Sequence, residues 1–108
     1  MYVILTSKPG QFHTEAGAGF RPVEAWNYLL CERPRAHFVI AEITGVPRVT
    51  IVDDQPPHTV NSVPIKFLEH FDSVSAARRT LEDLARSGRE CRLVPAAVVA
   101  IAAAVAAT

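Results

Sequence analysis

The clearest regular element in this sequence is an amphipathic helix at residues 72–87. Its apolar side chains recur every three or four residues, which places them on one face of a helix. That stripe consists of Val74, Ala77, Leu81 and Leu84. A helix with one apolar face must pack that face against another element, and the strands elsewhere in the chain supply a sheet for it to cover.

Short polar residues predict where this helix begins and ends. Asp72 or Ser73 is expected to cap its first turn. If Asp72 is the cap, Phe71 is in position to pack onto Ala76. Gly88 lies where a glycine commonly follows the last helical turn, so we expect the helix to end just before it.

Several other segments have the composition of strands. Residues 1–7 are rich in β-branched and aromatic types with apolar side chains on both faces, which predicts a strand covered on both sides or at an interface. Residues 36–43 and 48–53 flank a short turn, and we predict that they form a β-hairpin. Residues 54–65 contain three prolines, so this segment is an extended loop or an edge strand around 59–63.

Two segments between the first strand and residue 36 are harder to interpret. Residues 9–21 hold three of the five glycines and show no period, which predicts a long loop. Residues 22–32 favour a helix, because Pro22 suits a first helical position and the apolar residues fall at helical spacing. The alternative is a strand that turns at residues 32–35 into the next strand.

The predicted order of elements is β–α–β–β–α–(β), in which residues 91–94 form the last strand. This is the ferredoxin-like order, an α+β fold with an antiparallel sheet and helices on one face. The sequence predicts a single domain over residues 1–92 and an apolar tail rich in alanine and valine over residues 93–108. The tail is too short and too rich in alanine to span a bilayer, so an oligomer partner or a larger subunit is expected to cover it.

Composition excludes several functional classes. Apolar residues make up 49% and charged residues 20% of the 108 residues, as in globular domains. The formal net charge is zero and no run of like charge occurs, which argues against nucleic-acid binding. Cys31 and Cys91 are too few for a four-cysteine metal or iron–sulfur site, and we predict no cofactor. Without a secretory signal, a reducing cytoplasm is the expected location.

The candidate site residues are histidines on loops and strands, together with one acid and one aromatic residue. If the 9–21 and 54–65 loops meet over one end of the sheet, these side chains would line a polar pocket with an aromatic wall. The speculative ligand-binding set is His13, His37, His58, Asp53 and Trp26. No histidine pair has metal-ligand spacing, so no metal site is predicted. The competing interpretation makes them locally bonded histidines and a core tryptophan.

The opening MYVILTSKPG, followed by this order of elements, resembles the start of small dimeric α+β-barrel proteins of the YCII-related kind. The resemblance covers residues 1–10, and the histidine–aspartate site of that family has no matching motif in this chain. The whole pattern also resembles short bacterial proteins that accompany catabolic oxygenases. These resemblances imply a dimer or an accessory subunit.

The sequence therefore supports two main functional hypotheses. The first is a small non-catalytic subunit or accessory protein that self-associates or docks on a larger, catabolic enzyme. It rests on zero net charge, on apolar residues on both faces of the first strand and on the apolar tail. The alternative is a small dimeric α+β-barrel-type enzyme or ligand-binding protein with a pocket lined by His and Asp. A metal-binding protein that uses the same histidines is a third reading.

Overall fold

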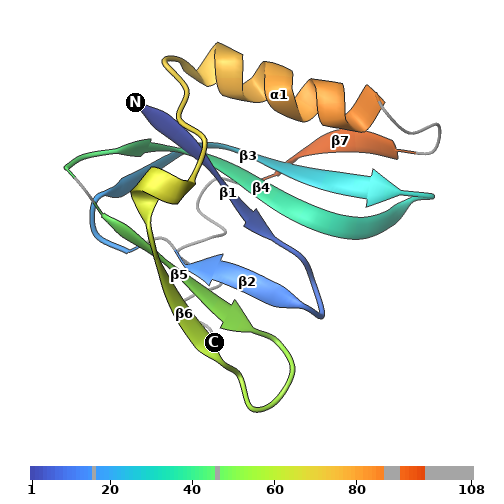
Figure 1. Ribbon diagram of the computed structural model, residues 1–108. Helices are drawn as coiled ribbons and strands as arrows, with labels where there is room; N and C mark the ends of the chain where they lie inside the picture. The colour runs from blue at the N-terminus through green and yellow to red at the C-terminus, as the bar shows by residue number, and fades with distance from the viewer. Residues whose placement is uncertain (16, 46, 87–90, 97–108) are drawn as a thin grey trace.

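The described part of the chain folds into two antiparallel β-sheets and one α-helix, arranged as in Figure 1. The computed structural model describes residues 1–15, 17–45, 47–86 and 91–96. Within those ranges far more residues lie in strands than in helices. The helix and the smaller sheet lie on opposite sides of the larger sheet, so the described chain forms three layers.

The larger sheet has four strands and brings together segments that are far apart in the sequence. In spatial order they are β1 (Tyr2–Ser7), β4 (Arg33–Ile43), β3 (Phe20–Leu30) and β7 (Cys91–Ala96). β4 lies between β1 and β3 and pairs with both, and β3 also pairs with β7, which forms the edge of the sheet. β7 confirms the last predicted strand and extends to Ala96, which places residues 93–96 of the predicted tail within the sheet.

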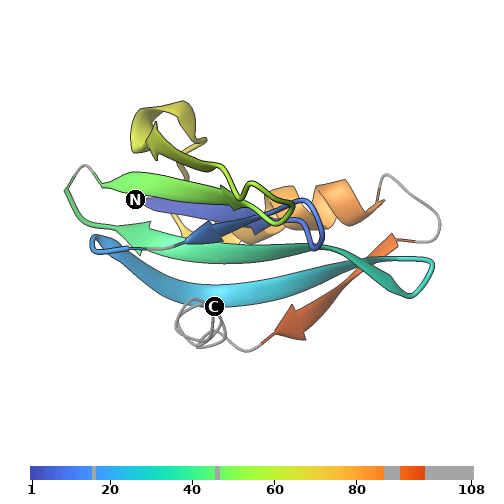
Figure 2. The same cartoon turned by 90° about the horizontal axis from the view of Figure 1, so that it is seen from below.

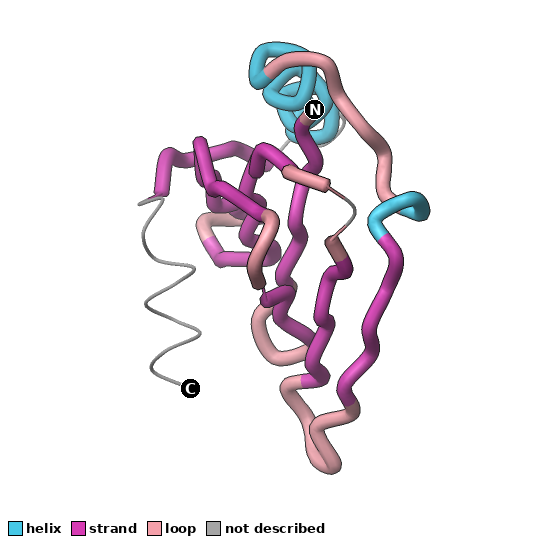
Figure 3. The backbone as a smooth tube through the Cα atoms, turned by 90° about the vertical axis from the view of Figure 1, so that its left-hand side faces the viewer, coloured by secondary structure: helices cyan, strands magenta, loops and turns pink. Residues whose placement is uncertain are grey.

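The smaller sheet has three strands and is built from intervening segments of the chain. It consists of β2 (Phe12–Glu15), β5 (Arg48–Asp53) and β6 (Val60–Pro64), with β5 in the centre. The edge strand predicted around residues 59–63 is thus confirmed. A short 3-10 turn, η1 (Ile65–Phe67), then leads toward the helix α1 (Val74–Arg86). Figure 3 shows the chain passing from β6 through this turn to the helix.

β4 is the central strand of the molecule, and both of its faces are buried. Val39 and Ala41 face the smaller sheet, where Val49 of β5 packs in the same cluster. Ile40 faces the opposite way, toward α1, and packs in a cluster with Leu81. A strand covered on both faces can carry a continuous apolar run, which explains FVIA at its centre. Figure 1 shows β4 between the helix and β5, and Figure 2 shows β4 and β3 running side by side to the turn that joins them.

The predicted helix is confirmed as α1, and so is its cap, whereas Leu84 of the predicted apolar stripe is 44% exposed. Ser73 is the residue that caps it, because its Oγ accepts the N–H of Ala76 at 3.1 Å. Ala77 and Leu81 are buried against the larger sheet. Gly88, expected just beyond the helix, lies outside the described residues.

The predicted ferredoxin-like α+β fold is wrong. Residues 22–32 belong to strand β3 and to its turn, so the alternative reading of this segment is the correct one. Residues 9–21 are not one long loop, since they include β2 and the start of β3. The described residues consequently hold one α-helix and two sheets, rather than one sheet with helices on one face.

The predicted hairpin of residues 36–43 and 48–53 is also wrong, although both segments are strands. β5 pairs with β2 and β6, whereas β4 pairs with β1 and β3. The chain changes sheet at a corner where the N–H of Thr44 donates to the carbonyl of Gly19 at 2.9 Å. Gly19 has a φ of 93°, and a Cβ there would lie 2.9 Å from Cβ of Pro47. Only a glycine fits this corner without strain.

A tight turn joins β3 to β4, and its two residues have an unusual backbone conformation. Cys31 and Glu32 have φ values of 53° and 62°, the left-handed pair that a two-residue hairpin turn requires. Asparagine and glycine favour this conformation, whereas other side chains are strained in it. The Cys-Glu pair therefore gives no turn signal in the sequence, although the backbone makes the turn.

We predict that the double variant Cys31→Asn, Glu32→Gly raises the free energy of unfolding by about 1 kcal/mol, because it relieves left-handed strain at both positions. Urea denaturation followed by circular dichroism measures the change. Cys31→Ala, Glu32→Ala is the matched control, since it removes the same side chains and keeps the strain. Equal stability of the two double variants would contradict the prediction.

Candidate functional site

The strongest polar cluster surrounds His13, on the outer face of the smaller sheet. Its Nδ1 lies 2.9 Å from Oδ1 of Asp54, and its Nε2 lies 3.3 Å from Oε1 of Glu15. All three side chains are about one-third exposed or less, at 32%, 27% and 34%. Carboxylate oxygens only accept, so both ring nitrogens are best satisfied when each carries a proton.

The charge state of His13 follows from these contacts. The hydrogen bond to Asp54 raises the pKa of His13, partial burial opposes the rise, and the bond to Glu15 adds to it. An imidazolium held between two carboxylates has both nitrogens engaged as donors. In that state neither nitrogen can accept a proton or bind a metal ion, so the cluster works as an electrostatic clamp between β2 and the end of β5.

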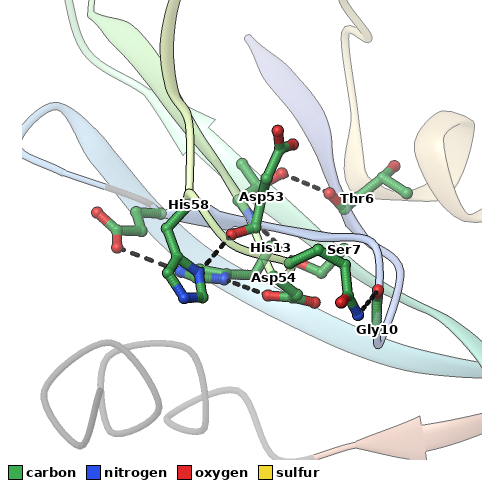
Figure 4. Close-up of polar contacts among 10 residues, drawn as sticks. Thr6, Ser7, Gly10, His13, Asp53, Asp54 and His58 are labelled. Carbon is green, nitrogen blue, oxygen red and sulfur yellow. Dashed lines mark hydrogen bonds and ion pairs between the residues drawn. The ribbon is translucent and has the colours of Figure 1, made fainter.

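His58 and Asp53 lie beside this cluster, as Figure 4 shows. Nδ1 of His58 lies 3.1 Å from the backbone carbonyl oxygen of Asp53. The Asp53 carboxylate points away from both labelled histidines in that view, because it shares the inner face of β5 with Val49 and Ile51. The loop that carries His58 is held by Gln55, whose Nε2 donates to the carbonyl of Gly10 at 3.1 Å.

His37 belongs to a different sheet and has a different partner. It lies on β4 opposite Ser7 of β1 and Asn27 of β3. Its Nδ1 lies 2.7 Å from Oδ1 of Asn27. Burial lowers the pKa of His37, since the charged ring would lose its hydration without gaining an acidic partner.

Trp26 lies on the helix-facing side of the larger sheet. Its Nε1 donates to Oε1 of Glu24 at 2.6 Å. The guanidinium of Arg78, on α1, donates to the same carboxylate through its Nε and one terminal nitrogen. These bonds tie the helix to β3. The Arg78 hydrogen bond holds the pKa of Glu24 below its usual range, partial burial opposes this, and the Trp26 bond reinforces it.

The structure thus brings some of the predicted site residues together and separates others. His13, His58 and the backbone of Asp53 gather at one end of the smaller sheet. His37 is bonded within the larger sheet, and Trp26 faces the helix. A ligand site that uses His13 and His58 remains a prediction, whereas the five residues do not line one pocket.

Sequence reasoning missed the partner Glu15, because residues 9–21 were interpreted as a loop. The alternation of His13 and Glu15 around Thr14 would have placed both on one face of a strand. Among the described residues, no group of three His, Cys, Asp or Glu side chains has the arrangement of a metal site. No helix in the described ranges is long and apolar enough to cross a bilayer.

Comparisons with protein-family models, curated proteins and solved structures give no match to this chain. The functional argument therefore depends on the geometry of its own side chains.

We predict that folding shifts the pKa values of His13 and His37 in opposite directions from their values in the urea-unfolded chain. His13 should have the higher pKa and His37 the lower one, as measured by NMR of the ring protons. Asp54→Asn should lower the pKa of His13 and leave that of His37 unchanged. A His13 pKa at or below its unfolded value would contradict the carboxylate contacts.

The same shifts set the pH dependence of stability. A histidine whose pKa is raised by folding stabilises the protein below its unfolded pKa, and this contribution is lost as pH rises through the folded value. For His13 the stabilisation is therefore present in mild acid and lost in mild base.

We predict that Glu24→Gln lowers the free energy of unfolding by about 1 kcal/mol at pH 7, because it weakens charge-assisted bonds that are partly open to solvent. Since folding lowers the pKa of Glu24, the wild-type advantage is present above the ordinary value of 4.5 and is lost as pH falls through the folded value. Denaturant titrations between neutral and acidic pH measure this.

Glu42→Gln is the matched control for that substitution. Glu42 also meets an arginine, Arg21, but this partner is 71% exposed. Glu42→Gln should lower the free energy of unfolding by less than Glu24→Gln does, because solvent screens the Arg21–Glu42 pair. An equal cost for both variants would show that the tie between β3 and α1 has no special weight.

Proposed function

We propose that this chain is a small non-catalytic accessory protein whose working form is a pair of identical subunits, joined along the free edge of β6. The supporting observation is that β6, whose own residues are uncharged, has no strand of the described chain on its outer side. Docking of that pair on a larger enzyme and a cytoplasmic location are further parts of the proposal.

The titratable side chains near the predicted site act as internal contacts. His13 is held by two carboxylates, His37 by Asn27 and His58 by a carbonyl of its own loop. The hydroxyl of Tyr28 donates to Sγ of Cys91 at 2.9 Å. Such partners suit a scaffold, because each group stabilises the fold in its bonded state.

Three of the four sheet edges are already occupied or protected. β1 exchanges two backbone hydrogen bonds of 2.8 Å between Tyr2 and Phe71. β2 is tied to β1 through Thr14, whose N–H donates to Ser7 Oγ at 2.9 Å and whose hydroxyl donates to the carbonyl of Thr6. β7 carries an arginine and a proline, residues that commonly protect edges.

β6 is less protected, because its proline is the last residue of the strand and the Arg48 guanidinium contacts only Ser62. Its first three residues are exposed, and the Val60 side chain is among the most exposed large apolar groups, at 63%. Within the described residues no strand pairs with its outer side. An edge of this kind is a template for another strand.

A second copy of the chain is the occupant that the charges favour. The formal net charge is zero, so two copies do not repel one another at long range. The strand VNSVP is itself uncharged, and an antiparallel pair about a two-fold axis would place no like charges opposite one another. From the neighbouring strand β5, Arg48 donates to Oγ and the carbonyl of Ser62, at 2.8 and 3.0 Å. Pairing would displace this guanidinium.

We predict that the wild-type chain shows a monomer–dimer equilibrium at roughly 1–100 μM in sedimentation experiments, as expected for a small interface. Val60→Lys should abolish the dimer, because a lysine on an edge strand opposes pairing with another strand. Val60→Thr is the matched control and should dimerise, since it keeps the β-branched shape.

Arg48→Ala provides a change of opposite sign. It should strengthen the dimer, because it frees the Ser62 carbonyl. A wild-type chain that stays monomeric up to about 500 μM would reject the proposed pair. A dimer that Val60→Lys leaves intact would reject the β6 edge as its interface.

A further inference from the structure

A cleft of about 350 Å³ opens on the helix-facing side of the larger sheet, and no residue of β6 or of the His13 cluster lines it. Three segments meet around it: the turn after β1, the start of β4 with the facing part of β3, and the last turns of α1. The residues that line it are Lys8, Gln11, Tyr28, Arg35, Ala36, Phe38 and Leu84. The proposed pairing of subunits does not involve any of them.

The floor and one wall of the cleft are apolar. Ala36 and Phe38 are buried at 6% and 7% exposure and form the floor. The rings of Tyr28 and Phe38 meet edge to face, with centroids 6.2 Å apart and an interplanar angle of 76°. Leu84, which is 44% exposed, extends the apolar surface from the helix. An aromatic or branched aliphatic group could cover this surface.

The rim of the cleft is cationic. Lys8 and Arg35 line it from two different segments and are both exposed. Arginines elsewhere in the fold do have carboxylate partners: Arg21, Arg78 and Arg92 form ion pairs of 2.5–2.7 Å. No such ion pair joins Lys8 or Arg35 to a carboxylate of the described residues. Two cations that meet no carboxylate of the described residues, beside an apolar floor, suit an anion with an apolar body.

The tyrosine at the cleft has a fixed role. Its hydroxyl donates to Sγ of Cys91, and this bond raises the pKa of Tyr28, so the phenol stays neutral. The phenol hydrogen is therefore engaged, and the donors available to an anion are Lys8, Arg35 and the side-chain amide of Gln11. The negative head of a ligand would lie at the rim, and its body would lie over Phe38.

We propose that this cleft binds a small amphiphilic monoanion, namely a carboxylate with an aromatic or branched aliphatic body. Its volume is at the lower end for small-molecule sites, which suits a compact acid better than a nucleotide. The turn at residues 8–12 and the last turns of α1 give it walls that do not depend on a second subunit.

The test uses 3-phenylpropionate as the probe, titrated into the full chain and followed by two-dimensional NMR. We expect saturable shifts at Tyr28, Phe38 and Leu84, with a dissociation constant of roughly 1 mM or below. The neutral analogue 3-phenylpropanol should bind at least about tenfold more weakly, and inorganic phosphate should not shift the aromatic signals. Equal binding of the acid and the alcohol would overturn the role of the cations.

Substitutions at the rim sharpen the test. Arg35→Gln and Lys8→Gln should each weaken binding of the acid by roughly three- to tenfold, without changing the spectrum of the free protein elsewhere. Arg79→Gln is the matched control, because Arg79 is exposed on α1 and does not line the cleft. Its affinity should stay within about twofold of the wild type.

Two results would overturn the proposal. One is an absence of shifts at Tyr28 and Phe38 at saturating probe, and the other is an equal loss of affinity in Arg79→Gln and Arg35→Gln. Because these readouts do not depend on the oligomeric state, they separate the cleft from the β6 pairing. A Val60→Lys monomer that still binds the probe would support the cleft independently of the dimer.

Discussion

Burial of β4 on both faces is the constraint on which the rest of this structure depends. Val39, Ile40 and Ala41 are fully buried, and they alternate between the side of the smaller sheet and the side of α1. A strand of this kind has no solvent face, so two separate layers must cover it. The helix supplies one layer and the smaller sheet the other. The tie between Arg78 and Glu24 then fixes the helix, and Thr14 fixes the smaller sheet.

Local patterns in the sequence predicted the elements whose period is unambiguous. The helix at residues 72–87 and the strands within β1, β4 and β5 all follow from spacing alone. β3 did not, because Trp26, Leu29 and Leu30 satisfy helical spacing and a strand bulge interrupts its alternation near Pro22. The pairing of β5 with β2 and β6 could not be predicted from the sequence either. It depends on the close approach of Gly19 to the corner after β4, which no local pattern encodes.

The candidate site could be predicted only in part, for a related reason. His13, Asp53 and His58 were expected near one another because both of their loops were placed at one end of the sheet. The pairing of β2 with β5 brings His13, His58 and the backbone of Asp53 together, while the Asp53 carboxylate points away. Trp26 and His37 sit on opposite faces of the larger sheet, and the wrong secondary structure for residues 22–32 hid this. The cleft at Lys8 and Arg35 joins segments that only the tertiary fold brings together.

The order of strands in the larger sheet has a consequence for how fast the molecule forms. Tyr2 lies opposite Glu42, and Ala25 lies opposite Ala96, so two of the strand pairs in this sheet join residues that are distant along the chain. Each such contact requires a long loop to close before any pairing energy is gained. Chains with this topology cross their folding barrier on a millisecond-to-second scale, well behind helical bundles of equal size. The hairpin of β3 and β4, with its two-residue turn, is by contrast the most local pairing in this sheet.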